Sequence, residues 1–110
     1  MEWLEPWWST SGQGEEFHET FQRQLRLELS PSHELYGIPV KLIGRHGGSD
    51  DALFELLDGS GRVAVVHLTW AKSQQRLPWP VTTIYESLEA WAEQWMRPEH
   101  EEWAAGRDEN

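Results

Sequence analysis

Apolar side chains recur at helical spacing near the start of the chain, at Phe17, Phe21 and Leu25. A spacing of four places them on one face of a helix, and two glutamates at 15–16 suit its positive end. The pattern predicts a helix over residues 15–30, because proline at position 31 disfavours helical backbone before it. Leucines alternate with polar residues over 25–29, so a strand there is the alternative, and the longer helical pattern favours the helix.

A second helical stripe lies near the end of the chain, at Ile84, Leu88, Trp91 and Trp95. Thr83, followed three residues later by Glu86, matches a capping box and predicts the start of this helix. Pro98 is expected to end it. We expect the stripe to lie on a sheet face.

Between these helices the pattern changes to that of strands. Three segments rich in Val, Leu and Ile read as strands, over residues 40–45, 53–57 and 63–70. Gly47–Asp50 reads as a loop and Asp58–Gly61 as a four-residue hairpin turn, so consecutive strands pair antiparallel. Residues 81–83 could add a short fourth strand.

The expected architecture is an α+β domain of two layers. It consists of an antiparallel meander of three strands, or four, flanked by an N-terminal and a C-terminal helix that both pack on one face. The expected organisation is an irregular Trp-rich arm over 1–14, one domain over 15–98 and an acidic tail over 99–110. A chain of 110 residues suits one such domain.

The charge distribution narrows the class of partner. The net charge is −10, with −5 over residues 1–37, +1 over 38–85 and −6 over 86–110. Like charges repel a phosphate backbone, so we expect no nucleic-acid partner. No segment approaches the ~20 apolar residues of a membrane span, so we also expect no interaction with a membrane. The absence of cysteine and of a signal-peptide pattern at the N-terminus favours the cytoplasm.

The meander places the loop at 46–52 and the loop at 71–80 at the same end of the sheet. Loops on a rigid sheet commonly carry binding residues. The candidate binding residues gathered there are Arg45, His46, Asp50, Asp51, Trp70, Arg76 and Trp79. The alternative is that the two tryptophans are rim packing and the aspartates form turns.

Motifs for catalysis are absent from the sequence. It has no Gly-x-Ser-x-Gly elbow, no phosphate-binding loop and no pair of histidines at metal-ligand spacing. We therefore expect no catalytic residues, no metal and no cofactor. A metal-dependent hydrolase that uses His46, His67 and Asp50 or Asp51 is the third and weakest hypothesis.

One resemblance rests on the pieces Leu35-Tyr36-Gly37, Asp50-Asp51-Ala52-Leu53-Phe54-Glu55-Leu56, Val65-Val66-His67-Leu68-Thr69-Trp70 and Trp79-Pro80. In this DDxLFxL…VVHLTW…WP pattern, over residues 35–85, the chain resembles a family of small bacterial proteins of uncharacterised function. The resemblance implies a bacterial cytosolic protein and supplies no catalytic residue.

Function is therefore expected to lie in binding. Eight tryptophans exceed what one small core needs, so some could line an interface. The first hypothesis is a non-enzymatic protein-interaction module, regulatory or accessory, with a protein partner or a homodimer. The second is small-molecule or peptide binding at the loop end of the sheet.

Overall fold

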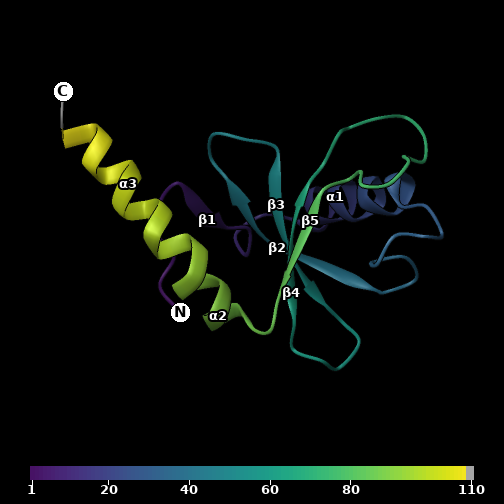
Figure 1. Ribbon diagram of the computed structural model, residues 1–110, viewed down its shortest axis with the longest axis horizontal. Helices are drawn as coiled ribbons and strands as arrows, with labels where there is room; N and C mark the ends of the chain where they lie inside the picture. Colours follow the sequence, from purple (N-terminus) through teal and green to yellow (C-terminus); the bar gives the residue numbers. More distant parts are fainter. Residues whose placement is uncertain (109–110) are drawn as a thin grey trace.

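The computed structural model describes residues 1–108 and shows an α+β fold built on a five-stranded antiparallel sheet (Figure 1). The strands lie in the order in which they occur in the sequence, from β1 to β5. The elements are β1 (Trp7–Ser9), α1 (Glu15–Glu28), β2 (Val40–His46), β3 (Asp51–Leu56), β4 (Val63–His67), β5 (Thr82–Tyr85), α2 (Leu88–Trp91), the π-helical segment η1 (Ala92–Met96) and α3 (Arg97–Asp108).

The predicted meander is confirmed as β2, β3 and β4, and one strand is added at each edge. β1 forms within the segment predicted as an irregular arm, where Trp7 pairs with His46. β5 covers residues 82–85, so the fourth strand considered for 81–83 exists and is shifted along the chain. β5 forms because a run of β-branched residues pairs along β4. The prediction of three or four strands was therefore too low.

The helices cover opposite faces of the sheet, which corrects the predicted two-layer arrangement. Figure 1 shows α1 and the C-terminal helix on different sides of the sheet. Phe21 and Leu25 of α1 pack on one face, and Trp91 and Met96 of the C-terminal helix pack on the other. The reason is visible in residues 63–66 of β4, whose four apolar side chains alternate between the two cores. A strand that is apolar on both faces needs cover on both.

The first helix ends where its C-terminal carbonyl groups meet the β4–β5 loop. α1 runs to Glu28, and the N–H of Leu29 donates to Leu25 O as the helix closes. Residues 25–28 are thus helical, which decides against the strand alternative. The helix buries Phe21, Leu25 and also the carboxylate of Glu28.

The C-terminal helix begins later and runs further than predicted. Ser87, whose hydroxyl accepts the N–H of Ala90, caps it, while Thr83 lies in β5. Pro98 does not end the helix. The backbone widens into a π-helical turn just before it, where the N–H of Arg97 donates to Ala92 O, and the helix continues through Pro98 as α3.

The segments at the two chain ends pack against each other. The N–H of Leu4 donates to Met96 Sδ at 3.5 Å, and the ring of His100 bonds Glu5 O at 2.6 Å. The predicted acidic tail over 99–110 is helical as far as Asp108. Its positions 109 and 110 lie outside the described residues. Within the described part of the chain, no helix has the length and apolar character needed to cross a membrane.

The turn between β3 and β4 makes one titration predictable. Hydrogen bonds from the Ser60 hydroxyl and N–H, and then from Arg62, lower the pKa of Asp58 from 3.8 to about 2. Gly59 and Gly61, with φ of +82° and +77°, allow this turn. Because the folded pKa is depressed, the stability that Asp58 contributes is complete above its ordinary pKa and is lost as pH falls through about 2.

Carboxyl-carbon NMR titration should therefore give Asp58 a midpoint near 2. The substitution Ser60→Ala should move this midpoint up towards 3.8, whereas Ser73→Ala, in another exposed turn, should leave it in place. An unchanged Asp58 midpoint in the Ser60→Ala protein would show that another group holds the carboxylate.

Candidate functional site

The two loops predicted to share one end of the sheet do so. Asp51, which begins β3, pairs with His67, which ends β4. The β2–β3 turn (residues 47–50) and the β4–β5 loop (residues 68–81) therefore leave the sheet at the same end. The structure confirms this arrangement of loops; whether the end binds anything stays a prediction.

The buried carboxylate of Glu28 holds the start of the β4–β5 loop. Its Oε1 accepts the N–H of Thr69 at 2.9 Å and the Thr69 hydroxyl at 2.7 Å. Its Oε2 accepts the N–H of Trp70 at 3.0 Å and the Gln24 amide at 2.7 Å. Glu28 is fully buried, and these four hydrogen bonds compensate the loss of water. A helix end thus fixes the path of the loop.

Trp70 has an unusual backbone that this carboxylate supports. Its φ is +57°, the left-handed region, which costs a residue with a side chain of order 1–3 kcal/mol. The hydrogen bond from its N–H to Glu28 favours that conformation. The strand predicted to reach Trp70 ends at His67 for the same reason, because Thr69 and Trp70 direct their N–H groups to α1 instead of to a strand.

Three further hydrogen bonds continue the attachment along the loop. Gln24 Nε2 donates to Ala71 O at 2.8 Å, and Gln75 N donates to Glu28 O at 2.9 Å. Gln74 Nε2 donates to Leu29 O at 3.2 Å. The loop therefore has a defined course over its first half, up to the turn in which Trp79 N donates to Arg76 O at 2.9 Å.

Apolar side chains on this held loop face solvent. The exposed fractions are 39% for Trp70, 55% for Leu77, 45% for Trp79 and 43% for Val81. We call these four residues the loop patch. Residues 68–81 also contain Lys72 and Arg76 and no acidic residue, which gives the loop a formal charge of +2 in a chain of −10. Large exposed apolar side chains on an ordered loop are typical of contact surfaces.

Arg45 is joined to the loop patch through one phenylalanine. Its guanidinium carbon lies 4.5 Å from the centre of the Phe21 ring, a cation–π contact. The same ring meets Trp70 edge to face, with ring centres 5.2 Å apart. Burial lowers the pKa of Arg45, and the carboxylates of Asp50 and Asp51 act in the opposite direction. Arg45 thus packs on the Phe21 ring that in turn contacts Trp70.

His46 lies on the opposite face, beside the C-terminal helix. Its Nδ1 accepts the N–H of Gly48 at 2.9 Å, so Nε2 carries the proton and donates to Glu99 Oε2 at 2.8 Å. The other Glu99 oxygen accepts the Trp7 indole N–H at 2.7 Å. His46 therefore belongs to a contact that fastens α3 to β1 and β2.

Asp51 is paired with His67. Its carboxylate accepts the Ser49 hydroxyl and lies 3.0 Å from His67 Nδ1. The residues of the metal-hydrolase hypothesis are thus divided between this pair and the His46–Glu99 contact. Among residues 1–108, no three His, Asp or Glu side chains gather closely enough to hold a metal ion.

The seven predicted residues consequently fall into four places. Arg45 and Trp70 share the α1 side, Arg76 and Trp79 lie on the outer part of the loop, and His46 and Asp51 lie on the far face. Asp50 is exposed in the β2–β3 turn. Sequence reasoning missed Glu28, although a signal was present. Glu28 lies seven residues after Phe21 and three after Leu25, which puts a carboxylate on the apolar face of the helix.

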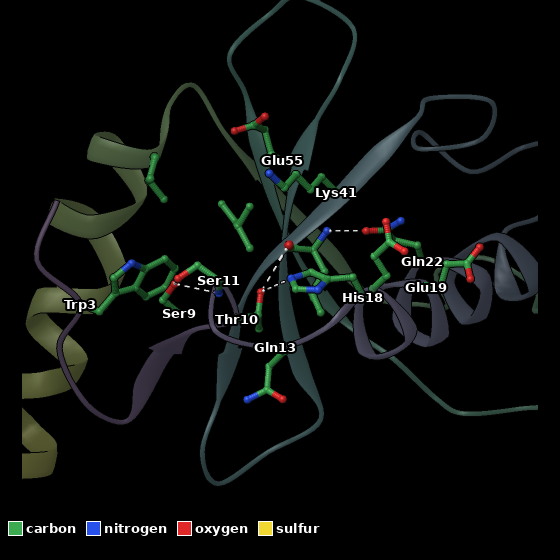
Figure 2. A pocket seen from close by; sticks show the side chains of 14 residues that line it. Trp3, Ser9, Thr10, Ser11, Gln13, His18, Glu19, Gln22, Lys41 and Glu55 are labelled. Atoms are coloured by element: carbon green, nitrogen blue, oxygen red, sulfur yellow. Dashed lines mark hydrogen bonds between the residues drawn. The ribbon is translucent and has the colours of Figure 1, made fainter.

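Two cavities lie away from the loop patch, and the second of them is lined by His46, one of the predicted binding residues. One, of about 700 Å³, opens beside β2 between the start of α1 and the N-terminal segment (Figure 2). The other, of about 450 Å³, lies among Pro6, Trp8, Trp103 and the Gly47-Gly48 backbone, next to His46. Of the described residues that line them, none is Trp70, Arg76 or Trp79.

Comparisons with known proteins leave the function to be argued from this geometry. The chain matched no protein-family model, no curated protein and no solved structure.

Proposed function

We propose that this chain is a non-enzymatic protein-interaction module, of a regulatory or accessory kind, whose contact surface is the β4–β5 loop. The observation that carries the proposal is that four apolar side chains are 39–55% exposed on a loop whose start, at Thr69 and Trp70, is held by the buried carboxylate of Glu28. A loop ordered before binding loses little conformational entropy when a partner arrives, and tryptophan beside arginine is the usual composition of an energetic centre.

The charges on the loop indicate the kind of partner. Lys72 and Arg76 lie between Trp70 and Leu77 in the sequence of the loop, whereas the rest of the chain is strongly acidic. The matching surface is an apolar depression with acidic groups around it, on another protein of a bacterial cytosol. Two loops of this chain facing each other would bring like charges together, which disfavours a homodimer through this surface.

A protein surface also suits the loop better than a small ligand does. Pockets for small molecules are concave and enclose most of the ligand. Trp70, Arg76 and Trp79 contribute to neither cavity described above, and Leu77 and Val81 contribute to neither as well. The loop patch presents its side chains outward from a fixed backbone.

The test compares two tryptophans of similar exposure. Trp79, at 45%, belongs to the loop patch, and Trp95, at 48%, lies on the C-terminal helix. A partner is captured from a bacterial lysate with the wild-type chain, purified, and titrated calorimetrically with each variant. We expect Trp79→Ala to weaken binding by about 30-fold or more, the effect of removing an energetic centre of about 2 kcal/mol, and Trp95→Ala to leave the Kd within about twofold.

Two further measurements test whether the charges of the loop contribute to partner binding. Arg76→Glu should also weaken binding, and the Kd of the wild type should rise with salt, because acidic groups of the partner lose an attractive contact. If Trp79→Ala changes the circular dichroism spectrum, Trp79 belongs to the core and its variant no longer tests binding. The Kd of Arg76→Glu then tests whether the loop contacts the partner. Equal binding by the Trp79→Ala and Trp95→Ala proteins would refute the proposal. So would sedimentation showing a homodimer that Trp79→Ala dissociates, because the partner would then be a second copy.

A further inference from the structure

The strand β2 has a strand neighbour along only part of its outer side. β1 pairs with β2 at three positions, Gly44, Arg45 and His46. Residues 40–42 of β2 pair with β3 on their inner side, and on the outer side no strand of the described chain continues β1. An unpaired strand edge of this kind is a template for a further strand.

Side chains occupy the backbone groups of this open edge. The N–H of Leu42 donates to Gln22 Oε1 at 3.1 Å, and its C=O accepts the Thr10 hydroxyl at 3.3 Å (Figure 2). Peptide groups alternate in direction along a strand, so Val40 directs its N–H and C=O the same way as Leu42. The backbone N–H of Thr10 also donates to Ile43 O at 3.1 Å, so the chain bonds β2 one residue beyond β1. At Leu42, the side chains of Gln22 and Thr10 stand where the backbone of a neighbouring strand would be.

The cavity of about 700 Å³ runs along this edge and has a wall on each side of the sheet. His18 and Gln22 of α1 form one wall, and Trp3 lies at the other (Figure 2). Leu88 also lines the cavity. Trp3 can lie there because position 44 is glycine, where an added Cβ would come within 2.6 Å of its ring. Successive side chains of a strand laid in the cavity would face the two walls in turn.

The rim of the cavity selects for positive charge. Glu15, Glu19 and Glu55 line it together with a single cation, Lys41, which gives these four side chains a formal charge of −2. The whole chain, at −10, adds to the negative potential. A second copy of this acidic chain is correspondingly disfavoured as the occupant.

We propose that this cavity is a docking groove for an extended, basic segment of another protein, which adds to the sheet along residues 40–42 of β2. The groove lies at the β1–β2 side of the sheet, whereas the loop patch leads into β5 at the other side. The two surfaces are separate, so the groove provides a second binding site that does not depend on the first.

The probe is the acetylated and amidated peptide Lys-Val-Lys-Val-Lys-Val, added to the full-length chain labelled with ¹⁵N. We expect saturable NMR shifts at the amides of Val40 and Leu42 below about 1 mM peptide. Methylation of alternate backbone nitrogens of the peptide should weaken binding by about tenfold or more, because strand pairing needs those N–H groups. Replacement of its lysines by glutamates should weaken binding at least as much.

One variant separates strand addition from ordinary ligand binding. Gln22→Ala frees the N–H of Leu42 for the peptide, so strand addition predicts a several-fold tighter Kd. A ligand held by the Gln22 side chain would instead bind more weakly. Gln13→Ala, which removes another amide from the cavity lining, should leave the Kd within about twofold, as should Trp79→Ala at the loop patch. Weaker binding by Gln22→Ala, no saturable shift at about 1 mM, or shifts confined to residues outside β2 would each overturn the proposal.

Discussion

Replacement of Glu28 by alanine should lower the free energy of unfolding by about 3–5 kcal/mol, since each buried donor left without a partner costs about 1–3 kcal/mol. The carboxylate accepts four hydrogen bonds, and three of them come from Thr69 and Trp70 of the β4–β5 loop. Alanine would leave these partly buried donors without their acceptor. Urea denaturation followed by far-UV circular dichroism measures the loss, and amide hydrogen exchange should show faster exchange at Trp70.

We call the Glu28 carboxylate with its hydrogen bonds to Thr69 and Trp70 the anchor. Two other variants distinguish the loss of these hydrogen bonds from the loss of a negative charge. Glu34→Ala removes an exposed carboxylate from the connector after α1 and should change the stability by less than about 0.5 kcal/mol. Glu28→Gln keeps the size and one acceptor oxygen, so it should cost less than Glu28→Ala. A Glu28→Ala protein as stable as Glu34→Ala would show that the loop is held by its other contacts.

The anchor also connects stability with the proposed function. If the loop patch binds because its backbone is ordered beforehand, then Glu28→Gln should weaken partner binding even though Glu28 is buried and cannot touch the partner. The effect should appear at temperatures where the variant is fully folded. Unchanged affinity in that variant would mean that the order of the loop is not what the partner uses.

The central sheet could be predicted because its signals are local. Hydrophobic runs separated by Gly47-Gly48 and by Gly59 and Gly61 determine three antiparallel neighbours, and from that follows the end at which each loop leaves the sheet. The edge strands could not be predicted in the same way. β1 has three residues and exists because Trp7 pairs with His46, a contact distant in sequence, and enters the core between the sheet and the C-terminal helix, which we call the second core.

The placement of the helices failed for a related reason. The two-layer expectation assigned every apolar stripe to one sheet face, although residues 63–66 of β4 already carry apolar side chains on both. The sequence predicts a helix end at Pro98 because proline breaks a regular α-helix, and it gives no signal for the π-helical turn over 92–96 that precedes Pro98 in the structure. The position of the second helix was therefore indicated by the local pattern of β4, whereas the passage of the helix through Pro98 was not.

The sheet topology expected from the sequence predicted one part of the candidate site and missed another part. Loop residues such as Trp79 were selected from topology alone. The division of His46 and Asp51 from Arg45 follows from strand alternation, which is fixed once the register of β2 against β3 is known. That register contains an irregularity between Leu42 and Gly44, which no pattern of hydrophobic residues indicates. The open edge beside Gln22 depends on where β1 stops, and it was equally hidden.

The second core depends most on Trp91, so its truncation should be the most damaging of the tryptophan substitutions. Trp91 is fully buried, and its ring lies 5.0 Å from that of Trp7 and 5.8 Å from that of Trp3, centre to centre. Removal of a buried aromatic side chain costs about 3–5 kcal/mol, because lost contacts and an unfilled cavity add together. Thermal and urea unfolding of Trp91→Ala should show a loss of this size.

The matched control lies one helical turn further along. Trp95→Ala removes the same side chain from a position that is 48% exposed, and we expect it to change the stability by less than about 1 kcal/mol. Trp91→Phe should fall between the two. Phenylalanine keeps an aromatic ring against Trp7, and it removes an indole N–H that has no hydrogen-bond partner among the described residues. If Trp91→Ala and Trp95→Ala unfold alike, the C-terminal helix does not hold the second face of the sheet, because a buried anchor and an exposed one would then contribute equally.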